Sequence, residues 1–273
     1  MIAILLVFSS LPLGAPEFPA IELGAAPLDF SGDPAMEMVT GIDRFLMREL
    51  AAAPARRAAH WMWDSSSHAA YEASIADNRE RLKTILGVVD ARVPPMMEMT
   101  ASPGMAAALA EAPDYAVYAV RWAVLAGVEA EGLLLEPRQT PRAAVIALAD
   151  CDVLPEALIG LADGLPPTAQ FARLLAQCGC RVVIPTLIDR RDTWSGHPAI
   201  RMTNQPHREF VYRAAFEMGH HIIGYEVQKI LAAVDWLQTQ SDAPIGVIGH
   251  GEGGLLAFYA AAVDPRITAV SYT

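Results

Sequence analysis

The chain has little positive charge, and its basic residues form no long run. Its 273 residues include 20 Lys and Arg against 31 Asp and Glu, which gives a formal net charge of −11. A surface that follows nucleic-acid phosphates needs clustered basic side chains. We therefore expect no nucleic-acid partner.

Cysteines are also scarce, and their number, 3, is odd, so no disulfide framework is expected. Cys178 and Cys180 flank Gly179 where a helix gives way to a strand, a setting that favours small buried side chains. No Cys-x-x-Cys or Cys/His spacing typical of zinc occurs. The adjacent His220 and His221 would diverge by about 100° on a helix, so they do not favour a metal site. The expectation is no metal and no cofactor.

Long apolar runs are missing, and a helical membrane span would need about 20 such residues. Residues 1–8 are apolar and are followed by Ser, Pro, Gly and Ala, a pattern typical of a secretory signal peptide, which we place at residues 1–24. No Lys or Arg precedes the run, which leaves an upstream start or a buried strand as alternatives. The signal-peptide interpretation predicts a secreted or periplasmic protein with no stable membrane insertion after signal removal.

The whole chain is 53% hydrophobic and 19% charged, which is the composition of a folded protein. Helical spacing of Ile42, Phe45, Leu46 and Leu50, and again over residues 67–86, predicts a helical N-terminal extension at residues 30–110.

Strands and helices alternate from about residue 115 onward. A hairpin is expected for residues 116–123 and 129–135, followed by buried strands at 143–149, 181–187, 243–249 and 267–271. The intervening helices are expected near residues 171–178, with Phe171, Leu174, Leu175 and Cys178 on one face, near 217–238, and at 253–263. This order predicts an α/β fold with a doubly wound, mostly parallel sheet at residues 115–273. Ligands of such sheets bind at the carboxyl ends of the strands.

One of those ends carries the sequence Gly249-His-Gly-Glu-Gly253 before an apolar helix. It has the frame of a nucleophile elbow, Gly-x-Ser-x-Gly, whose small residues permit tight packing. Gly251 stands at the nucleophile position and has no side chain to attack with. The glycines also satisfy Gly-x-Gly-x-x-Gly, with Asp264 as an acidic residue further on, so a dinucleotide site is an alternative, as is a purely structural turn.

From about residue 115 to 273 the chain resembles α/β-hydrolases of the dienelactone hydrolase and acetyl xylan esterase type, including large secreted bacterial members with a helical N-terminal part. The resemblance rests on residues 249–262, on the helix at Phe171 that leads to residues 182–186, and on residues 204–209, 224–226 and 235–236. It implies hydrolysis of small-molecule or carbohydrate esters. It also implies further strands, which would carry the acid and histidine of a triad, so we expect the hydrolase core to be truncated at its C-terminus.

The resemblance also implies roles for individual residues. The backbone N–H of Glu252 would be one oxyanion-hole donor, and the second would come from the loop around Cys151 and Asp152. His250, Asp152 and Trp194 are candidates for substrate binding.

Each of these assignments has a structural alternative. The side chain of Glu252 would be a helix N-terminal acid, Cys151 a buried small residue, His250 a half-buried histidine, and Trp194 an anchor of its surface loop. His207 is expected in a structural cluster with its two neighbours. The alternative to an esterase-like protein is a non-catalytic carbohydrate- or ester-binding module.

Overall fold

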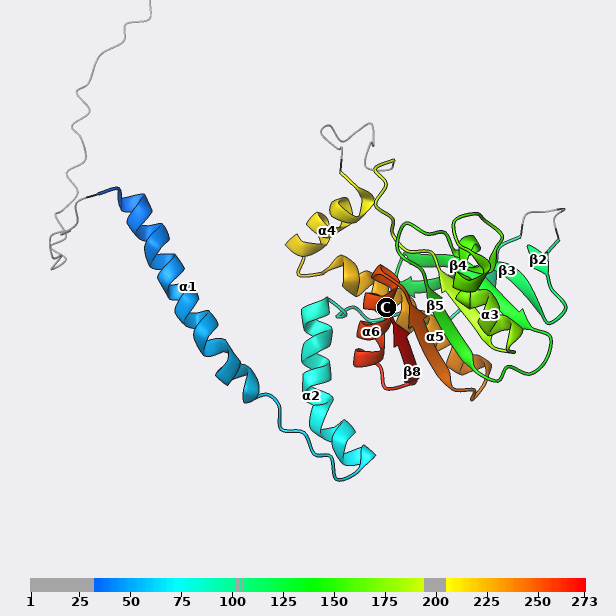
Figure 1. Ribbon diagram of the computed structural model, residues 1–273, viewed down its shortest axis with the longest axis horizontal. Coiled ribbons are helices and arrows are strands. Elements are labelled where there is room, and N and C mark those ends of the chain that lie inside the picture. Colours follow the sequence, from blue (N-terminus) through cyan, green and yellow to red (C-terminus); the bar gives the residue numbers. More distant parts are fainter. Residues whose placement is uncertain (1–31, 102–103, 105, 194–204) are drawn as a thin grey trace, which may run out of the picture. The chain divides into compact units, whose positions relative to one another are not determined.

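The computed structural model describes residues 32–101, 104, 106–193 and 205–273 (Figure 1). By its internal contacts the chain divides into two compact units, Met1–His60 and Trp61–Thr273. The predicted signal peptide, residues 1–24, lies outside the described residues. No described helix is long and apolar enough to cross a membrane.

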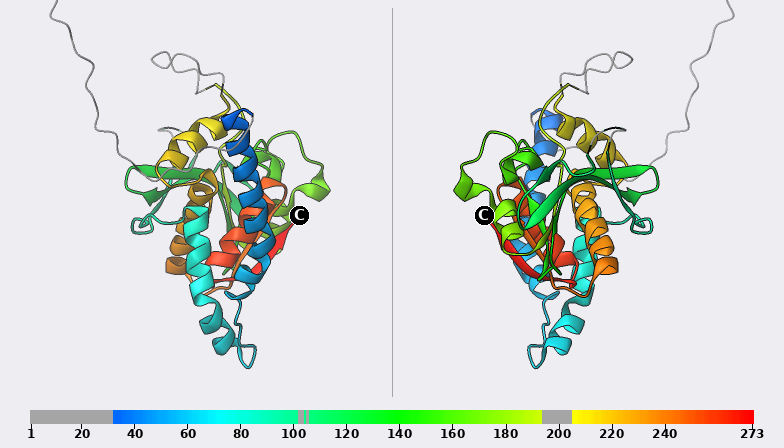
Figure 2. Two further views of the ribbon diagram at one scale, coloured as in Figure 1. Left: turned by 90° about the vertical axis from the view of Figure 1, so that its left-hand side faces the viewer. Right: turned by 90° about the vertical axis from the view of Figure 1, so that its right-hand side faces the viewer.

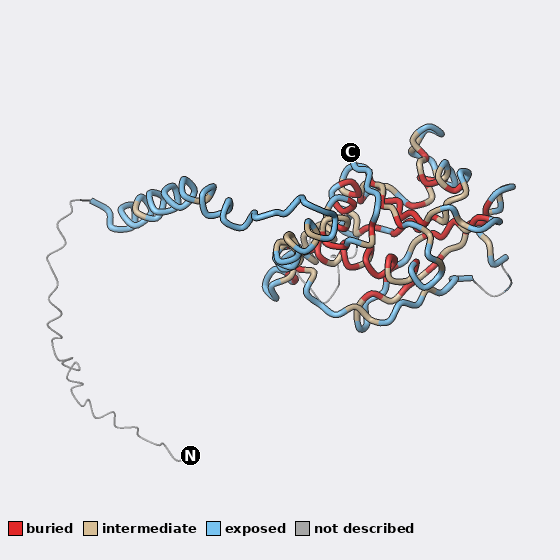
Figure 3. The backbone as a smooth tube through the Cα atoms, turned by 90° about the horizontal axis from the view of Figure 1, so that it is seen from below, coloured by how far each residue is buried: buried red, intermediate tan, exposed pale blue. Residues whose placement is uncertain are grey.

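The first unit contains one described helix, α1 (Pro34–Ala58). Its start is fixed by Asp33, whose side chain accepts a hydrogen bond from the N–H of Ala35, and by the proline at the first helical position. The helical prediction is thus confirmed here. None of its residues is buried, and the helix is pale blue along most of its length in Figure 3.

The second unit is built on an eight-stranded sheet with the order β1-β3-β4-β6-β5-β7-β8, and β2 pairs with β3. Strands β6, β5, β7 and β8 are parallel, whereas β1 to β4 pair antiparallel and β4 joins β6 antiparallel. The strands are β1 (Met97–Met99), β2 (Ala110–Glu111), β3 (Tyr115–Leu125), β4 (Val128–Pro137), β5 (Ala144–Leu148), β6 (Arg181–Pro185), β7 (Ile245–Gly249) and β8 (Ile267–Tyr272).

Helices cover both faces of the parallel half, as doubly wound sheets require (Figure 2). Helices α2, α5 and α6 pack together over one face, and α3 with η1 packs on the other. The helices of this unit are α2 (His68–Leu86), η1 (Pro155–Ile159), η2 (Pro167–Ala169), α3 (Phe171–Gln177), α4 (His207–Glu217), α5 (Ile222–Gln240) and α6 (Glu252–Val263). The predicted fold class, an α/β fold with a doubly wound sheet and a helical N-terminal part, is confirmed.

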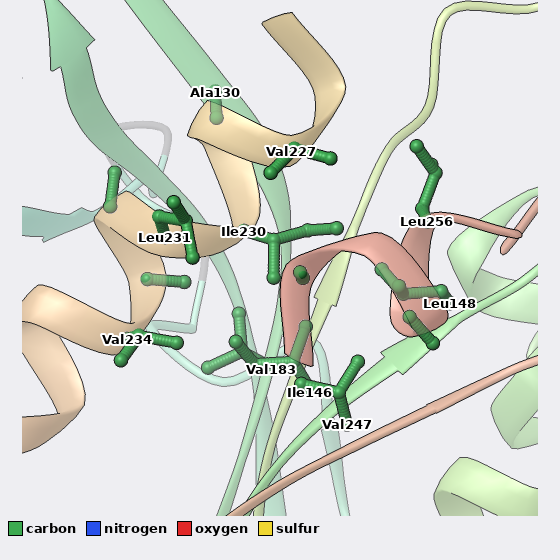
Figure 4. Packing of buried hydrophobic residues seen from close by; sticks show 14 of the residues in the cluster. Ala130, Ile146, Leu148, Val183, Val227, Ile230, Leu231, Val234, Val247 and Leu256 are labelled. Carbon is green, nitrogen blue, oxygen red and sulfur yellow. The ribbon is translucent and has the colours of Figure 1, made fainter. Parts of the chain in front are cut away.

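The core consists of two apolar layers separated by the sheet. Along β5, Ile146 and Leu148 belong to the layer under α5 and α6, while Ala147 belongs to the layer under α3. Figure 4 shows residues of the first layer, among them Ile230 of α5 and Ile146 of β5. Every residue of β5 is buried, which explains why its sequence is a continuous apolar run.

The predicted hairpin is confirmed as β3 and β4, with Gly127 at φ 76° in the turn between them. Strands β1 and β2 were not predicted. They have 3 and 2 residues, too few for a periodic pattern to stand out, and they are mostly exposed.

Two helix predictions need correction. Of the predicted apolar face of α3, Phe171 and Leu175 pack against the core, but Leu174 is 42% exposed and Cys178 is exposed, and the fully buried residues are Ala172 and Ala176. Small residues face the sheet there because the helix packs closely against it.

The helix expected at 217–238 is α5, which begins later, at Ile222. The preceding helix α4 was not predicted, and a turn at Gly219 with φ 74° separates the two. His221 is the N-cap of α5, and its Nδ1 accepts a hydrogen bond from the N–H of Ile223 at 3.0 Å. His220 and His221 therefore lie in a connection and not on a helix.

Helix α2 belongs to the same compact unit as the sheet, because that unit begins at Trp61. Its last residue, Leu86, is buried in the layer that contains α5 and α6. The predicted domain boundary at residue 115 stays a prediction.

The pair formed by His220 and Asp90 predicts a pH dependence of stability. Nε2 of His220 lies 3.0 Å from Oδ2 of Asp90, and the hydrogen bond to Asp90, with a second to the Met218 carbonyl, raises the pKa of His220. A raised folded-state pKa stabilises the fold below the unfolded value of about 6.5, and the gain disappears as pH rises through the folded pKa.

We expect His220→Gln to lower the free energy of unfolding in urea by about 0.5 kcal/mol near pH 5.5, a small value because the pair is in contact with water. Near pH 8.5 the loss should shrink. Asp90→Asn should remove the same pH dependence, and equal losses at both pH values in His220→Gln would contradict the assignment.

Candidate functional site

The turn between β7 and α6 is built of glycines for steric reasons. A Cβ at Gly249 would lie 2.0 Å from the carbonyl oxygen of Gly253, and a Cβ at Gly253 would lie 2.3 Å from that of Ala149. Neither position can hold a side chain. Gly251, at φ 61° and ψ −126°, has a backbone conformation that L-residues rarely adopt, and it turns the chain directly from strand into helix.

Two backbone N–H groups from different loops converge on one oxygen beside this turn. Oδ1 of Asp150 accepts hydrogen bonds from the N–H of Cys151 at 2.9 Å and from the N–H of Glu252 at 3.2 Å. Asp150 and Cys151 follow β5, and Glu252 follows its parallel neighbour β7. The structure thus brings the two predicted donors together, and it adds a carboxylate that the sequence analysis missed.

The same carboxylate lies where a side chain at position 251, the predicted nucleophile position, would extend. A Cβ on Gly251 would lie 3.0 Å from Cγ and 3.2 Å from Oδ1 of Asp150. The signal available in the sequence was an acidic residue next to the proposed donor loop, at the carboxyl end of a buried strand. Its contact with Gly251 depends on the pairing of two strands that are distant in the sequence.

Arg190 connects this group to the loop after β6. Its backbone N–H and Nη1 donate to the two carboxylate oxygens of Asp152 at 2.9 and 2.7 Å, and its Nη2 lies 3.9 Å from Oδ1 of Asp150. These backbone and side-chain hydrogen bonds from Arg190 lower the pKa of Asp152. Asp152 is therefore held as an anion against a cation.

A cavity of about 490 Å³ opens at the carboxyl ends of β5 and β6. Its walls are the apolar side chains that follow β5, the backbone that follows β6, and the two arginines of that loop. The lining residues are Cys151, Asp152, Val153, Leu154, Thr186, Leu187, Asp189, Arg190 and Arg191. Each arginine is paired with a carboxylate of the same lining, Arg190 with Asp152 and Arg191 with Asp189, so the cavity offers mainly apolar contacts to a ligand.

The Cys151 thiol is unsuited to act as a nucleophile. Cys151 is buried, and burial is the main reason that its pKa rises to about 11. The thiol therefore stays protonated at neutral pH, whereas the thiolate is the reactive form.

The side chain of Glu252 binds a different partner from its backbone N–H. It forms an ion pair with Nη2 of Arg208, whose Nη1 donates to the carbonyl oxygen of Ile188 at 2.8 Å. The contact joins the start of α6 to α4 and to the loop after β6. Only the backbone N–H of Glu252 is turned toward Asp150.

A buried ion pair in α5 holds the same loop. Oε1 of the fully buried Glu226 accepts from the N–H of Ile188 at 2.7 Å, and Lys229 Nζ lies 2.6 Å from Oε2. Lys229 also donates to the carbonyl oxygen of Thr186 at 2.7 Å. The backbone on either side of Leu187, which lines the cavity, is therefore fixed by one charged pair.

His207 also lies at this loop, but its contacts differ from the predicted cluster with its neighbours. Its Nδ1 lies 2.8 Å from Oδ1 of Asp189, and its Nε2 lies 3.3 Å from Oγ1 of Thr193. Burial would raise the pKa of Asp189, but hydrogen bonds from Arg191 outweigh this and lower it. Of the sequence neighbours, Arg208 binds Glu252, and Glu209 pairs with Arg213.

None of the other predicted residues in the described part of the chain donates a hydrogen bond to Asp150. His250 is exposed, and its backbone N–H donates to the Leu148 carbonyl at 3.1 Å. Asp264, the candidate for a ribose contact, is paired with Arg266. Trp194 lies outside the described residues. Within residues 32–101, 104, 106–193 and 205–273, no three His, Cys, Asp or Glu side chains form a group that could hold a metal.

Comparisons with known proteins point to one fold. No protein-family model and no curated protein matches the chain. A proposed acetyl xylan esterase from Bacteroides fragilis is similar in structure, with TM-score 0.51 and 16% identity over 72% of this chain and 52% of that one. An acetyl xylan esterase from a Thermoanaerobacterium species (TM-score 0.45, 13% identity, 72% and 58% covered) and a glucuronoyl esterase from Solibacter usitatus (0.47, 17%, 72% and 58%) also match.

At such identities the likeness shows the fold, and the α/β-hydrolase type of sheet predicted from the sequence is confirmed. The chain spans about half the length of the Bacteroides protein, 52%. The dienelactone hydrolase resemblance and the truncated C-terminus stay predictions.

The contact between Gly251 and Asp150 predicts a coupled pair of substitutions. Gly251→Ala should lower the free energy of unfolding by about 2 to 4 kcal/mol, because it adds a strained φ and an overlap with Asp150. Combining it with Asp150→Ala should cost less than the sum of the two single changes. Urea unfolding of the four proteins measures the coupling.

Gly127→Ala is the matched control, because Gly127 has φ 76° but open space around a Cβ. It should cost only about 1 to 2 kcal/mol, the price of the φ alone. If the substitutions at 251 and 150 were additive, the proposed overlap would be wrong.

The buried pair in α5 predicts a second effect on stability. Glu226→Ala should lower the free energy of unfolding by about 2 to 4 kcal/mol, because the half-buried Lys229 and the N–H of Ile188 both lose the carboxylate that they bind. Replacing both residues by Met should recover part of this loss. Chemical denaturation tests the prediction, and a loss below about 1 kcal/mol for Glu226→Ala would contradict it.

Proposed function

We propose that this chain recognises carboxylic esters at the turn between β7 and α6, with the backbone N–H groups of Cys151 and Glu252 as the oxyanion hole. The observation that carries the proposal is their convergence on a single oxygen, at 2.9 and 3.2 Å. That oxygen belongs to a carboxylate, so a negatively charged oxygen already occupies the place where an oxyanion of acyl transfer would lie.

Ser-type hydrolysis is not part of the proposal. Gly251, at the apex of the turn, carries no nucleophile, the Cys151 thiol is protonated, and the Glu252 carboxylate is paired with Arg208. The hole is kept without the group that would form an acyl-enzyme.

The expected ligands are small-molecule or carbohydrate esters. The name of the Bacteroides protein, acetyl xylan esterase, supports this class. Asp152 lines the neighbouring cavity, and we keep it, His250 and Trp194 as proposed substrate contacts. Secretion, based on residues 1–24, belongs to the same proposal.

A non-catalytic ester- or carbohydrate-binding module is the second candidate. It is favoured by the Asp150 carboxylate, which fills the space next to Gly251 that a nucleophile would need. A dinucleotide site is disfavoured, because Asp264, the residue expected to bind the ribose, is paired with Arg266.

We expect the chain to hydrolyse p-nitrophenyl acetate no faster than buffer and to remain unlabelled by a fluorophosphonate probe. Gly251→Ser together with Asp150→Ala, made in the longest natural form of the chain, separates the two candidates. Recovered esterase activity would identify a degenerate enzyme, and continued inactivity with intact ester binding would identify a binding module. Robust activity of the unchanged chain that persists in Cys151→Ala and Glu252→Ala would contradict the proposed site.

A further inference from the structure

Asp150 has a position that the recognition of esters does not explain. We propose that its carboxylate is a built-in ligand of the oxyanion hole, and that a small carboxylate binds there only by displacing it. The inference rests on the proposed function, because it assigns the two N–H groups to ligand binding.

The hydrogen bonds of Asp150 support a displaceable contact. Both N–H groups are used by the same oxygen, Oδ1, and no other hydrogen bond to this carboxylate is found in the described part of the chain. The side chain is 37% exposed, so it can rotate toward solvent without opening the core. Because Gly251 contributes no Cβ, the space beside the carboxylate is not locked by a neighbouring side chain.

Arg190 is placed to receive the displaced carboxylate. Its Nη1 and backbone N–H are bound to Asp152, while Nη2 lies 3.9 Å from Oδ1 of Asp150. A rotation of the Asp150 side chain would bring the two groups into hydrogen-bond contact. The negative charge then stays paired when the hole is vacated, which lowers the free energy needed for displacement.

The neighbouring cavity defines the chemical class of the ligand. Cys151 supplies a hole donor and also lines the cavity of about 490 Å³, so a ligand held at the hole can extend into it. Val153, Leu154 and Leu187 offer apolar contacts there. An aliphatic monocarboxylate satisfies both parts, with its charged group on the N–H pair and its chain in the cavity.

Competition by Asp150 predicts that its removal strengthens binding. We would titrate the ¹⁵N-labelled protein with sodium butyrate and follow the amide signals of Cys151 and Glu252 by NMR. Asp150→Ala should bind butyrate at least about tenfold more tightly than the unchanged chain, and Asp150→Asn, which keeps the shape but not the charge, should lie between them. Methyl butyrate, the neutral ester, tests whether the effect extends to esters.

A matched control removes one negative charge elsewhere. Asp163→Ala deletes an exposed carboxylate in the turn after η1, so it should leave butyrate affinity unchanged. A gain equal to that of Asp150→Ala would mean that net charge alone governs binding, and it would overturn the inference.

A second pair of variants tests the hole itself. Glu252 is the first residue of α6, a position that accepts proline, so Glu252→Pro removes its N–H while the helix is kept. In the Asp150→Ala background, Glu252→Pro should abolish the gain, whereas Glu252→Ala, which keeps the N–H, should retain it. Retention of the gain in the proline variant would overturn the inference.

The outcomes also separate the inference from the proposed function. If the unchanged chain binds butyrate as tightly as Asp150→Ala, with both amide signals shifting, the hole is a binding site but Asp150 does not block it. If neither protein binds butyrate or methyl butyrate while their spectra stay native, both the inference and the proposed function are wrong.

Discussion

The close approach of α6 to the ends of β5 and β7 is the constraint on which the site depends. Gly253 lies so near the carbonyl oxygens of Leu148 and Ala149 that a Cβ there would be 2.4 and 2.3 Å from them. The start of the helix is thereby pressed against the loop that follows β5. Because the first N–H groups of a helix have no partner within it, this approach directs one of them into the space beside that loop.

Electrostatic contacts then hold three loops around that space. Arg190, in the loop after β6, binds Asp152, in the loop after β5. Arg208 of α4 binds Glu252 at the start of α6. The buried Glu226 fixes the backbone between them by accepting from Ile188. Backbone N–H groups placed by such a framework lose little further freedom when they bind an anion, which is the physical basis of a preorganised oxyanion hole.

The sequence predicts most of the fold because its signals are local. The apolar run of β5 and the glycines at 249 and 253 lead directly to a buried strand and a tight turn. The face of α3 was misjudged because alanine, not leucine, fits the short distance to the sheet, and α4 was missed because only one of its residues is buried. Asp150 was missed for another reason: its partner Glu252 is 102 residues away, and only the pairing of β5 with β7 brings them together.

Gly251 and Asp150 are best understood as one structural unit. The carboxylate occupies the volume that a side chain at 251 would need, so the two positions are alternative ways to fill one space. A side chain at 251 would therefore require Asp150 to move from its present position, whereas glycine at 251 leaves that position open. Glycine at 251 thus leaves room for the carboxylate to accept hydrogen bonds from both N–H groups, and N–H groups left without a partner in a partly buried site destabilise the fold.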